Sequence, residues 1–225
     1  HPPDRLGISC QCIGERDNLM AITYPITIPT AQGFTSISIR PFSRVGVFTS
    51  EFTGSQQVYA HAGQFLICEI SFPAMKRADA APIVAALQSL QGALGTFYFG
   101  DPAWSYPIGV GTGTPLVDGA SQSGTTLITD GWTASQTGIM KAGDWVQIGA
   151  GSSRQLCTVL EDADSDGAGD ATLSLFPRIR TAFADNVGLT VNNPKGVWRL
   201  ASEISFSQTL GGMTQIETVT AVEAF

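Results

Sequence analysis

The feature that most constrains the fold is a β-rich pattern that stops near residue 104 and resumes near residue 196. Residues 95–104 read as a strand that ends at a Gly-Asp-Pro turn, and residues 196–209 read as a long strand. The glycine-rich stretch between them has strands and turns of its own. The pattern predicts an outer β-domain, residues 20–105 and 196–225, that is interrupted by an inserted domain, residues 106–195.

Composition supports an all-β interpretation. Apolar residues make up 43% of the 225 residues and charged residues 14%, with 25 glycines and 12 prolines. Low charge with frequent turn formers is typical of β-proteins. We therefore predict a mainly β fold, in which a β-sandwich-like outer domain with one α-helix is interrupted by an inserted small β-barrel.

Hydropathy and charge argue against two classes of partner. No apolar run approaches the roughly 20 residues that cross a bilayer, so we expect no membrane span. The net charge is −7, and residues 106–195 carry nine acids against five bases. Specific or nonspecific binding to nucleic acid needs clustered Lys and Arg, so we expect none.

Alternation of apolar and polar residues predicts the strands of the outer domain. In residues 34–40 isoleucines alternate with serines, which is the period of a half-buried strand. Cys68 falls in phase with Leu66 and Ile70, so we expect it to be a small buried residue. Further strands are expected at residues 45–52, 56–60, 64–72, 97–99, 197–207 and 215–225, with a turn at Gly211-Gly212.

One helix is predicted after residue 78. Asp79 is its expected N-cap, and Pro82 falls in its first turn, where a missing N–H is tolerated. The steps of four, three and four along the chain predict one apolar stripe, made of Ile83, Leu87, Leu90 and Leu94.

The inserted segment has four predicted strands, at residues 127–129, 144–148, 155–160 and 172–176. The glycine-rich residues 109–113 lack the Gly-Lys-Ser/Thr of a phosphate-binding loop, so we interpret them as a flexible linker. The irregular residues 1–19 are expected to be a disordered leader.

A run of acids resembles the start of a calcium loop. Asp162, Asp164 and Asp166 occupy positions 1, 3 and 5 and Gly167 position 6, but Leu173 stands where the loop requires Glu. The flanks read as strands. We therefore predict a solvated hairpin turn here and no metal site.

Catalytic chemistry finds little support in the sequence. Apart from His1, the one histidine is His61, which reads as a turn residue, and no Gly-x-Ser-x-Gly elbow accompanies it. Paired carboxylates could be drawn from Asp118, Asp130 and Asp144, but each lies beside a glycine and reads as a turn residue. We expect no enzyme, no cofactor and no catalytic residue.

Two tryptophans of the inserted segment keep a second function open. Trp132 follows a predicted turn and is expected to be exposed, whereas Trp145 lies in a predicted strand. Exposed aromatic rings can hold sugar rings, although core packing is the commoner role for so large a side chain. A glycan-binding module that contacts a host surface polysaccharide is therefore the alternative function.

Several phrases of the chain resemble a known family. The opening at residues 20–25, the strands and helix through residue 99, and the inserted β-domain with a returning C-terminal hairpin resemble the distal tail proteins of long-tailed, siphovirus-type bacteriophages. Residues 64–73, 143–148 and 173–180 are also similar to recurring phage tail sequences. The resemblance covers most of residues 20–225.

The resemblance implies a structural protein of the virion tail that assembles in the host cytoplasm. In that family a ring, usually of six subunits, joins the tail tube to the baseplate or tip. The outer domain would form the ring and contact the tail tube and baseplate or tip proteins, while the inserted barrel would point outwards. The family has no catalytic residues to carry over.

Overall fold

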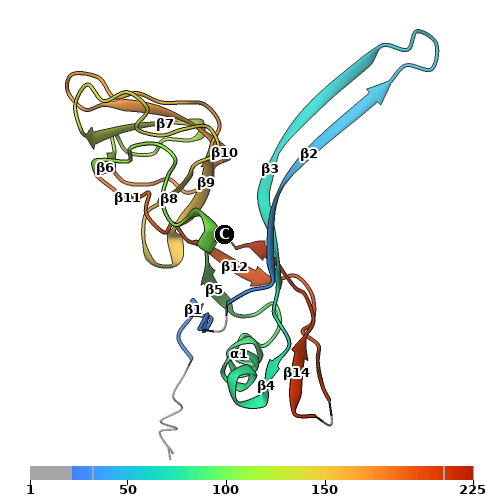
Figure 1. The fold of residues 1–225 in the computed structure, drawn as a ribbon. Helices are drawn as coiled ribbons and strands as arrows, with labels where there is room; N and C mark the ends of the chain where they lie inside the picture. Colours follow the sequence, from blue (N-terminus) through green and yellow to red (C-terminus); the bar gives the residue numbers. More distant parts are fainter. Residues whose placement is uncertain (1–21, 32, 210, 225) are drawn as a thin grey trace, which may run out of the picture.

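The computed structural model describes residues 22–31, 33–209 and 211–224, and the predicted leader, residues 1–19, lies outside them. The fold is mainly β, and the described residues contain a single α-helix. Three parts are visible in Figure 1: a lower region with the helix, a barrel-like sheet, and a long hairpin that projects away from both. No helix of the described residues has the length and apolar character needed to cross a membrane.

A six-stranded sheet forms the body of the protein, in the order β1-β5-β12-β15-β3-β2. Its strands are β1 Ile26–Thr27, β2 Ser36–Thr49, β3 Gln56–Ser71, β5 Thr96–Phe99, β12 Gly196–Leu200 and β15 Val219–Glu223. The predicted alternation is confirmed, because Ile37 and Ile39 are half-buried between exposed serines. Cys68 is also confirmed as a buried core residue.

The strands that flank residues 106–195 are neighbours in this sheet. β12 pairs antiparallel with β5, so that Gly196 lies opposite Phe99 and Val197 opposite Tyr98. The indole N–H of Trp198 donates to the carbonyl of Phe99 over 2.8 Å. The chain therefore leaves the sheet at the end of β5 and re-enters it in the neighbouring strand β12.

The helix α1, Arg77–Ser89, starts earlier than the sequence indicates. Strand β4, Met75–Lys76, runs directly into it, and Lys76 rather than Asp79 is the N-cap residue. The carbonyl of Gly212 accepts the first backbone N–H, from Arg77, so no capping side chain is needed there. Pro82 consequently lies inside the helix, not in its first turn.

The predicted apolar stripe of the helix is confirmed for three of its four residues. Ile83, Leu87 and Leu90 are buried, but Leu94 is largely exposed. The chain adopts positive φ at Gln91 and Gly92, which ends the helix and moves Leu94 off its axis.

A small three-stranded sheet covers one side of α1, in the order β13-β14-β4. Its other strands are β13 Phe206–Gln208 and β14 Met213–Ile216, joined by the predicted turn at residues 211–212. The predicted strand 197–207 is therefore interrupted between Leu200 and Phe206. The predicted final strand is likewise split, because β14 and β15 belong to different sheets.

The inserted segment folds into a nearly closed barrel-like sheet of six strands, in the order β11-β8-β9-β10-β7-β6. A bridge between Leu116 and Gly188 brings its two edges together. The strands are β6 Gly113–Val117, β7 Gly124–Trp132, β8 Trp145–Ile148, β9 Gln155–Val159, β10 Ala171–Ile179 and β11 Leu189–Thr190. The four predicted strands are all present, and β6 and β11 were missed.

The protein has two apolar cores, and the barrel packs against the body. The barrel interior has its own cluster, which includes Val146 and Ile148. Three barrel side chains instead pack on the core of the body: Trp145, Leu156 and Phe176. The guanidinium of Arg154 lies 4.0 Å from the ring centroid of Tyr98 in β5. The junction between the two parts is therefore packed and not a loose linker.

Candidate interaction surfaces

The most unusual surface is a hairpin without support from the rest of the fold. Strands β2 and β3 continue past a register shift between Ser43 and Val45, pair as far as Thr49 and Gln56, and turn at residues 50–55. We call residues 44–61 the arm. Figure 1 shows it extending away from the body and the barrel.

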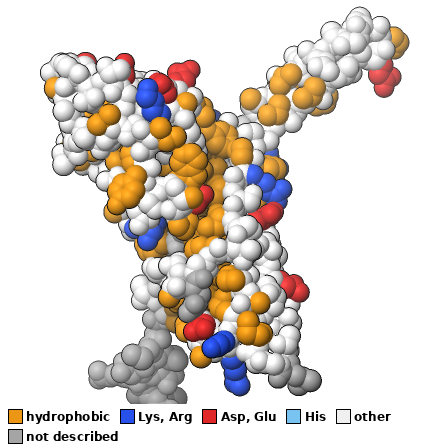
Figure 2. All heavy atoms as spheres, in the orientation of Figure 1, with side chains coloured by type: hydrophobic (Ala, Val, Ile, Leu, Met, Phe, Trp, Pro, Cys, Tyr) orange, Lys and Arg blue, Asp and Glu red, His pale blue; other side chains and the backbone are white. Residues whose placement is uncertain are grey.

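Both faces of the arm carry exposed apolar side chains. Residues opposite each other in an antiparallel pair share a face. One face holds Val45, Val47 and Val58, and the other holds Phe48 and Tyr59, whose rings meet edge to face at 5.9 Å. All five are about half exposed or more. Hydrophobic atoms follow the arm in the space-filling view (Figure 2).

The tip of the arm presents one fully exposed aromatic ring. Phe52 lies in the turn and is 98% exposed. The turn itself is well formed, since the N–H of Gly54 donates to the carbonyl of Ser50 over 2.9 Å. Phe52 is therefore held outwards on a stable turn, which is the position of an anchor residue for a partner.

His61 lies within β3 on the arm, and its prediction as a turn residue was wrong. Its side chain is near Gly46 of β2, because a Cβ built on that glycine would lie 3.8 Å from the imidazole Nε2. Periodicity failed here because Ala60, Ala62 and Gly63 give no alternation to read.

The three candidate carboxylates do not form one site. Asp144 is fully buried and accepts backbone N–H groups from Ile108, Gly109 and Lys141 at 2.6, 3.0 and 2.8 Å. Asp118 and Asp130 act electrostatically at another place, on Asp170. Partial burial and the nearby Asp166 raise the pKa of Asp170, and both carboxylates add to that rise.

The acidic run is a turn in which the carboxylates serve the protein itself. Asp166 accepts three backbone N–H groups, which lowers its pKa. Asp164 accepts the N–H of Gly138, and Asp162 pairs with Lys141 at 2.7 Å. No group of three metal-ligating side chains is found among the described residues. The turn interpretation fits this arrangement, because each of the three carboxylates accepts hydrogen bonds from the protein itself.

The exposure predicted for Trp132 was wrong. Trp132 lies in β7, is 4% exposed, and its indole N–H donates to the hydroxyl of Thr129 over 2.8 Å. Trp145 is covered on the side where the barrel packs on the body. The alternation around Trp132 is hidden by Asp130-Gly131, which the sequence presents as a turn. Neither tryptophan forms an exposed platform.

The glycines at residues 109–113 are packed, and their prediction as a flexible linker was wrong. The N–H of Gly111 donates to the carbonyl of Ile139 over 2.9 Å. A Cβ on Gly109 would fall 2.6 Å from the same carbonyl oxygen. Glycine is therefore required at residue 109 for close approach of two backbones.

The two cysteines among the described residues are free and buried. Burial, with smaller contributions from Asp101 and Glu69, raises the pKa of Cys68 to about 12. Burial also raises the pKa of Cys157. Neither thiol is poised to act as a nucleophile, because a raised pKa disfavours the reactive thiolate.

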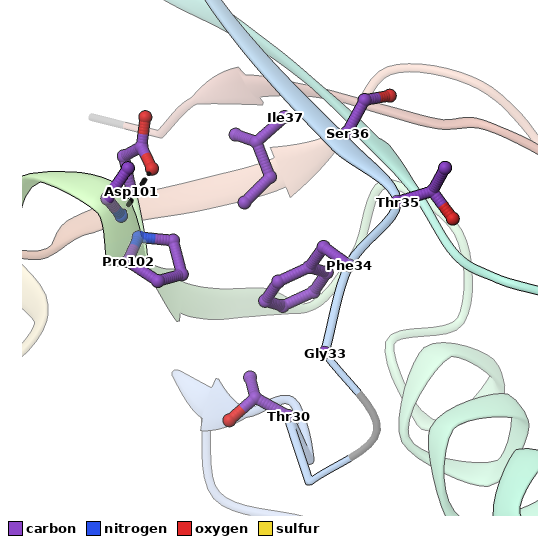
Figure 3. A pocket seen from close by; sticks show the side chains of 9 residues that line it. Thr30, Gly33, Phe34, Thr35, Ser36, Ile37, Asp101 and Pro102 are labelled. Carbon is purple, nitrogen blue, oxygen red and sulfur yellow. Dashed lines mark hydrogen bonds between the residues drawn. The ribbon is translucent and has the colours of Figure 1, made fainter.

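A shallow crevice of about 430 Å³ lies where β2 begins (Figure 3). Phe34, Ile37 and Pro102 supply its apolar walls. Its one carboxylate, Asp101, accepts the N–H of Ala103 over 2.9 Å and so caps the short 3₁₀ helix Pro102–Trp104. The crevice has no pair of groups arranged for proton transfer.

Comparison of the chain with protein-family models and with curated proteins gave no match.

Proposed function

We propose that this chain is a structural protein of a bacteriophage tail, which assembles with copies of itself into a ring between the tail tube and the baseplate or tip. The observation that carries the proposal is the arm, a hairpin with apolar side chains on both faces and little contact with its own chain. The similarity to distal tail proteins adds the place of the ring in the virion.

The arm supports assembly on energetic grounds. Burying a Val or Phe side chain contributes about 1.5–3 kcal/mol, and the arm holds six such residues, counting Tyr59 and Phe52. A contiguous exposed apolar surface on a soluble protein marks an interaction site. Pro41 in β2, ahead of the arm, interrupts the N–H donors along one edge of the hairpin, which guards against unspecific strand pairing.

The packed junction between barrel and body also suits a structural part. The barrel contributes three side chains to the core of the body and a guanidinium to Tyr98. A barrel fixed in this way would hold a constant direction in every subunit of a ring. The alternative of glycan binding is less well supported, because its two candidate residues, Trp132 and Trp145, are both covered.

The experiment is to purify the chain, follow its mass by light scattering over a wide range of concentration, and image it by electron microscopy. We expect closed rings with a central opening, and labelled antibody at the end of the tail tube in particles that contain the chain. A monomer at all concentrations, together with particles that bind no antibody, would contradict the proposal.

A further inference from the structure

We infer that the arm of one copy inserts Phe52 into the groove between α1 and the β13–β14 hairpin of a second copy. The inference rests on the proposed ring and names the surface that receives the arm. It draws on three features: the shape of the tip, the lining of the groove, and a pair of opposite charges.

The tip offers a single apolar side chain for insertion. Phe52 is 98% exposed, and the residues beside it in the turn are polar: Ser50, Glu51 and Thr53. A rigid aromatic side chain surrounded by polar groups is the composition of an interface anchor. The tip therefore requires a receiving site that is apolar inside and polar at its rim.

The groove has that composition. Its floor consists of small or apolar side chains of α1, among them Ala81, Val84 and Ala85, and its far wall is Phe206. Arg77 and Gln88 lie at its rim. Small residues on a helix leave room above the backbone, and Phe206 itself is 39% exposed. An aromatic ring placed there would contact the helix on one side and Phe206 on the other.

Charge completes the match. Glu51 is exposed at the tip, and Arg77 is exposed at the rim of the groove. Neither forms an ion pair with another described residue. Insertion of Phe52 would bring the neighbouring carboxylate to the side of the groove where opposite charge is available, which favours one orientation of docking.

The two surfaces cannot meet within one chain. Figure 1 places the arm tip at one end of the molecule and α1 with β14 at the other. A contact between different surfaces of identical copies is heterologous and repeats from copy to copy until the rotation closes a ring. A second copy is therefore the occupant that the geometry favours.

The test measures association by light scattering and mass photometry. Phe52→Ala is expected to weaken association at least about tenfold, because a buried aromatic contact is lost. Ala85→Trp should weaken it similarly by filling the groove. Ala78→Trp lies on the exposed side of the same helix outside the groove and is the matched control, expected to leave association unchanged.

A charge exchange makes the test specific. Glu51→Arg and Arg77→Glu should each weaken association, and the chain that carries both should recover to within about threefold of the wild type. Far-ultraviolet circular dichroism and thermal unfolding verify that each variant folds. The effect of Ala85→Trp on association is interpreted only if this variant unfolds at the same temperature as the wild type. The charge-exchange test does not depend on that variant.

The outcomes separate this inference from the proposed function. Rings that persist in Phe52→Ala and Ala85→Trp would overturn the inference and leave the ring standing. Rings that are lost in Phe52→Ala but kept in Ala85→Trp and Arg77→Glu would mean that the tip docks elsewhere, which also overturns it. A wild-type chain that never associates removes the proposed function and the inference together.

Discussion

Two buried carboxylates join segments that are distant in the sequence. Asp144 ties the entry of the barrel at residues 108–109 to the turn before β8 by accepting three N–H groups. Glu223 in β15 pairs with Arg180, which follows β10, over 2.5 Å and accepts the N–H of Leu66. Asp144 and the ion pair of Glu223 with Arg180 therefore hold connections that no strand pairing provides.

Removing the first carboxylate should destabilise the protein. Asp144→Ala removes a buried carboxylate and leaves three partly buried backbone N–H groups without their acceptor, so we expect the free energy of unfolding to fall by about 3 kcal/mol. Urea unfolding followed by tryptophan fluorescence measures the change. Asp118→Ala, at an exposed position, is the control and should stay within about 0.5 kcal/mol. Equal effects of the two variants would contradict the assigned role.

The second carboxylate should give a pH signature. Burial raises the pKa of Glu223 above its ordinary value of 4.5, and Arg180 and the N–H of Leu66 offset only part of this. A raised folded-state pKa means that the folded protein binds the proton more tightly than the unfolded chain. The stabilising contribution is therefore complete below pH 4.5 and is lost as the pH rises through the raised pKa.

Glu223→Gln removes this titration. We expect the difference in free energy of unfolding, wild type minus Glu223→Gln, to shift in favour of the wild type as the pH falls from about 7 to about 5. Urea unfolding of both chains across that range provides the measurement. A difference that is constant with pH, or that shifts towards the variant, contradicts the assignment.

At the scale of single residues, the sequence predicted positions in regular strands and failed at turns. The burial of Cys68 follows from its phase with Leu66 and Ile70. Trp132 could not be placed, because Asp130-Gly131 reads as a turn although both residues belong to β7. Burial there depends on closure of the barrel, which local pattern does not reveal.

Among the elements, the arm is distinguished by how little it contributes to the fold. Its strands extend the hairpin beyond Gln64, which still contacts Arg178 and Arg180 of the barrel segment. Joining Val45 to Ala60 by an Asn-Gly turn, which deletes residues 46–59, retains a closing strand pair and a favoured two-residue turn.

We expect this deletion to leave the midpoint of thermal unfolding within about 3 °C of the wild type, since mainly exposed side chains are removed. It should abolish the proposed assembly, leaving monomers in light scattering at concentrations where the wild type is expected to form rings. The control for association is Ile128→Ala, at an exposed position on the barrel, which should associate like the wild type. Assembly that survives the deletion would contradict the role of the arm.

The lengths of the elements were harder to predict than their existence. Residues 45–52, 56–60 and 64–72 were expected to be separate strands, whereas the last two form one strand of 16 residues. Both faces of the arm carry apolar residues, so alternation disappears where it leaves the body. The two-residue strand β11 was missed because it owes its form to pairing with β8.

For the molecule as a whole, the junction decides whether barrel and body behave as one unit. Arg180 donates to the carbonyl of Gln64 over 2.7 Å and pairs with Glu223, while the N–H of Arg178 donates to the side chain of Gln64 over 3.0 Å. Trp145 and Phe176 add apolar contact at the same place. The general arrangement of two β parts could be predicted, but not which side chains join them.

Arg180→Ala should therefore act on both parts. It leaves the carboxylate of Glu223 buried without its cation, and we expect a loss of about 3–5 kcal/mol. Scanning calorimetry should show one transition in the wild type and a separated barrel transition in the variant. Arg40→Ala removes an exposed ion pair with Glu69 and should change little. Two well-separated transitions in the wild type would show that the junction does not couple the parts.

In the inferred assembly, the placement of the arm tip and the α1 groove at opposite ends of the molecule gives a linear array of copies two dissimilar ends. A subunit with a blunted tip and an intact groove would still be taken up at one end, but it would pass nothing on to the next. Such a subunit acts as a chain terminator. A minor fraction of it, co-expressed with normal copies, is expected to leave open arcs in place of the proposed closed rings.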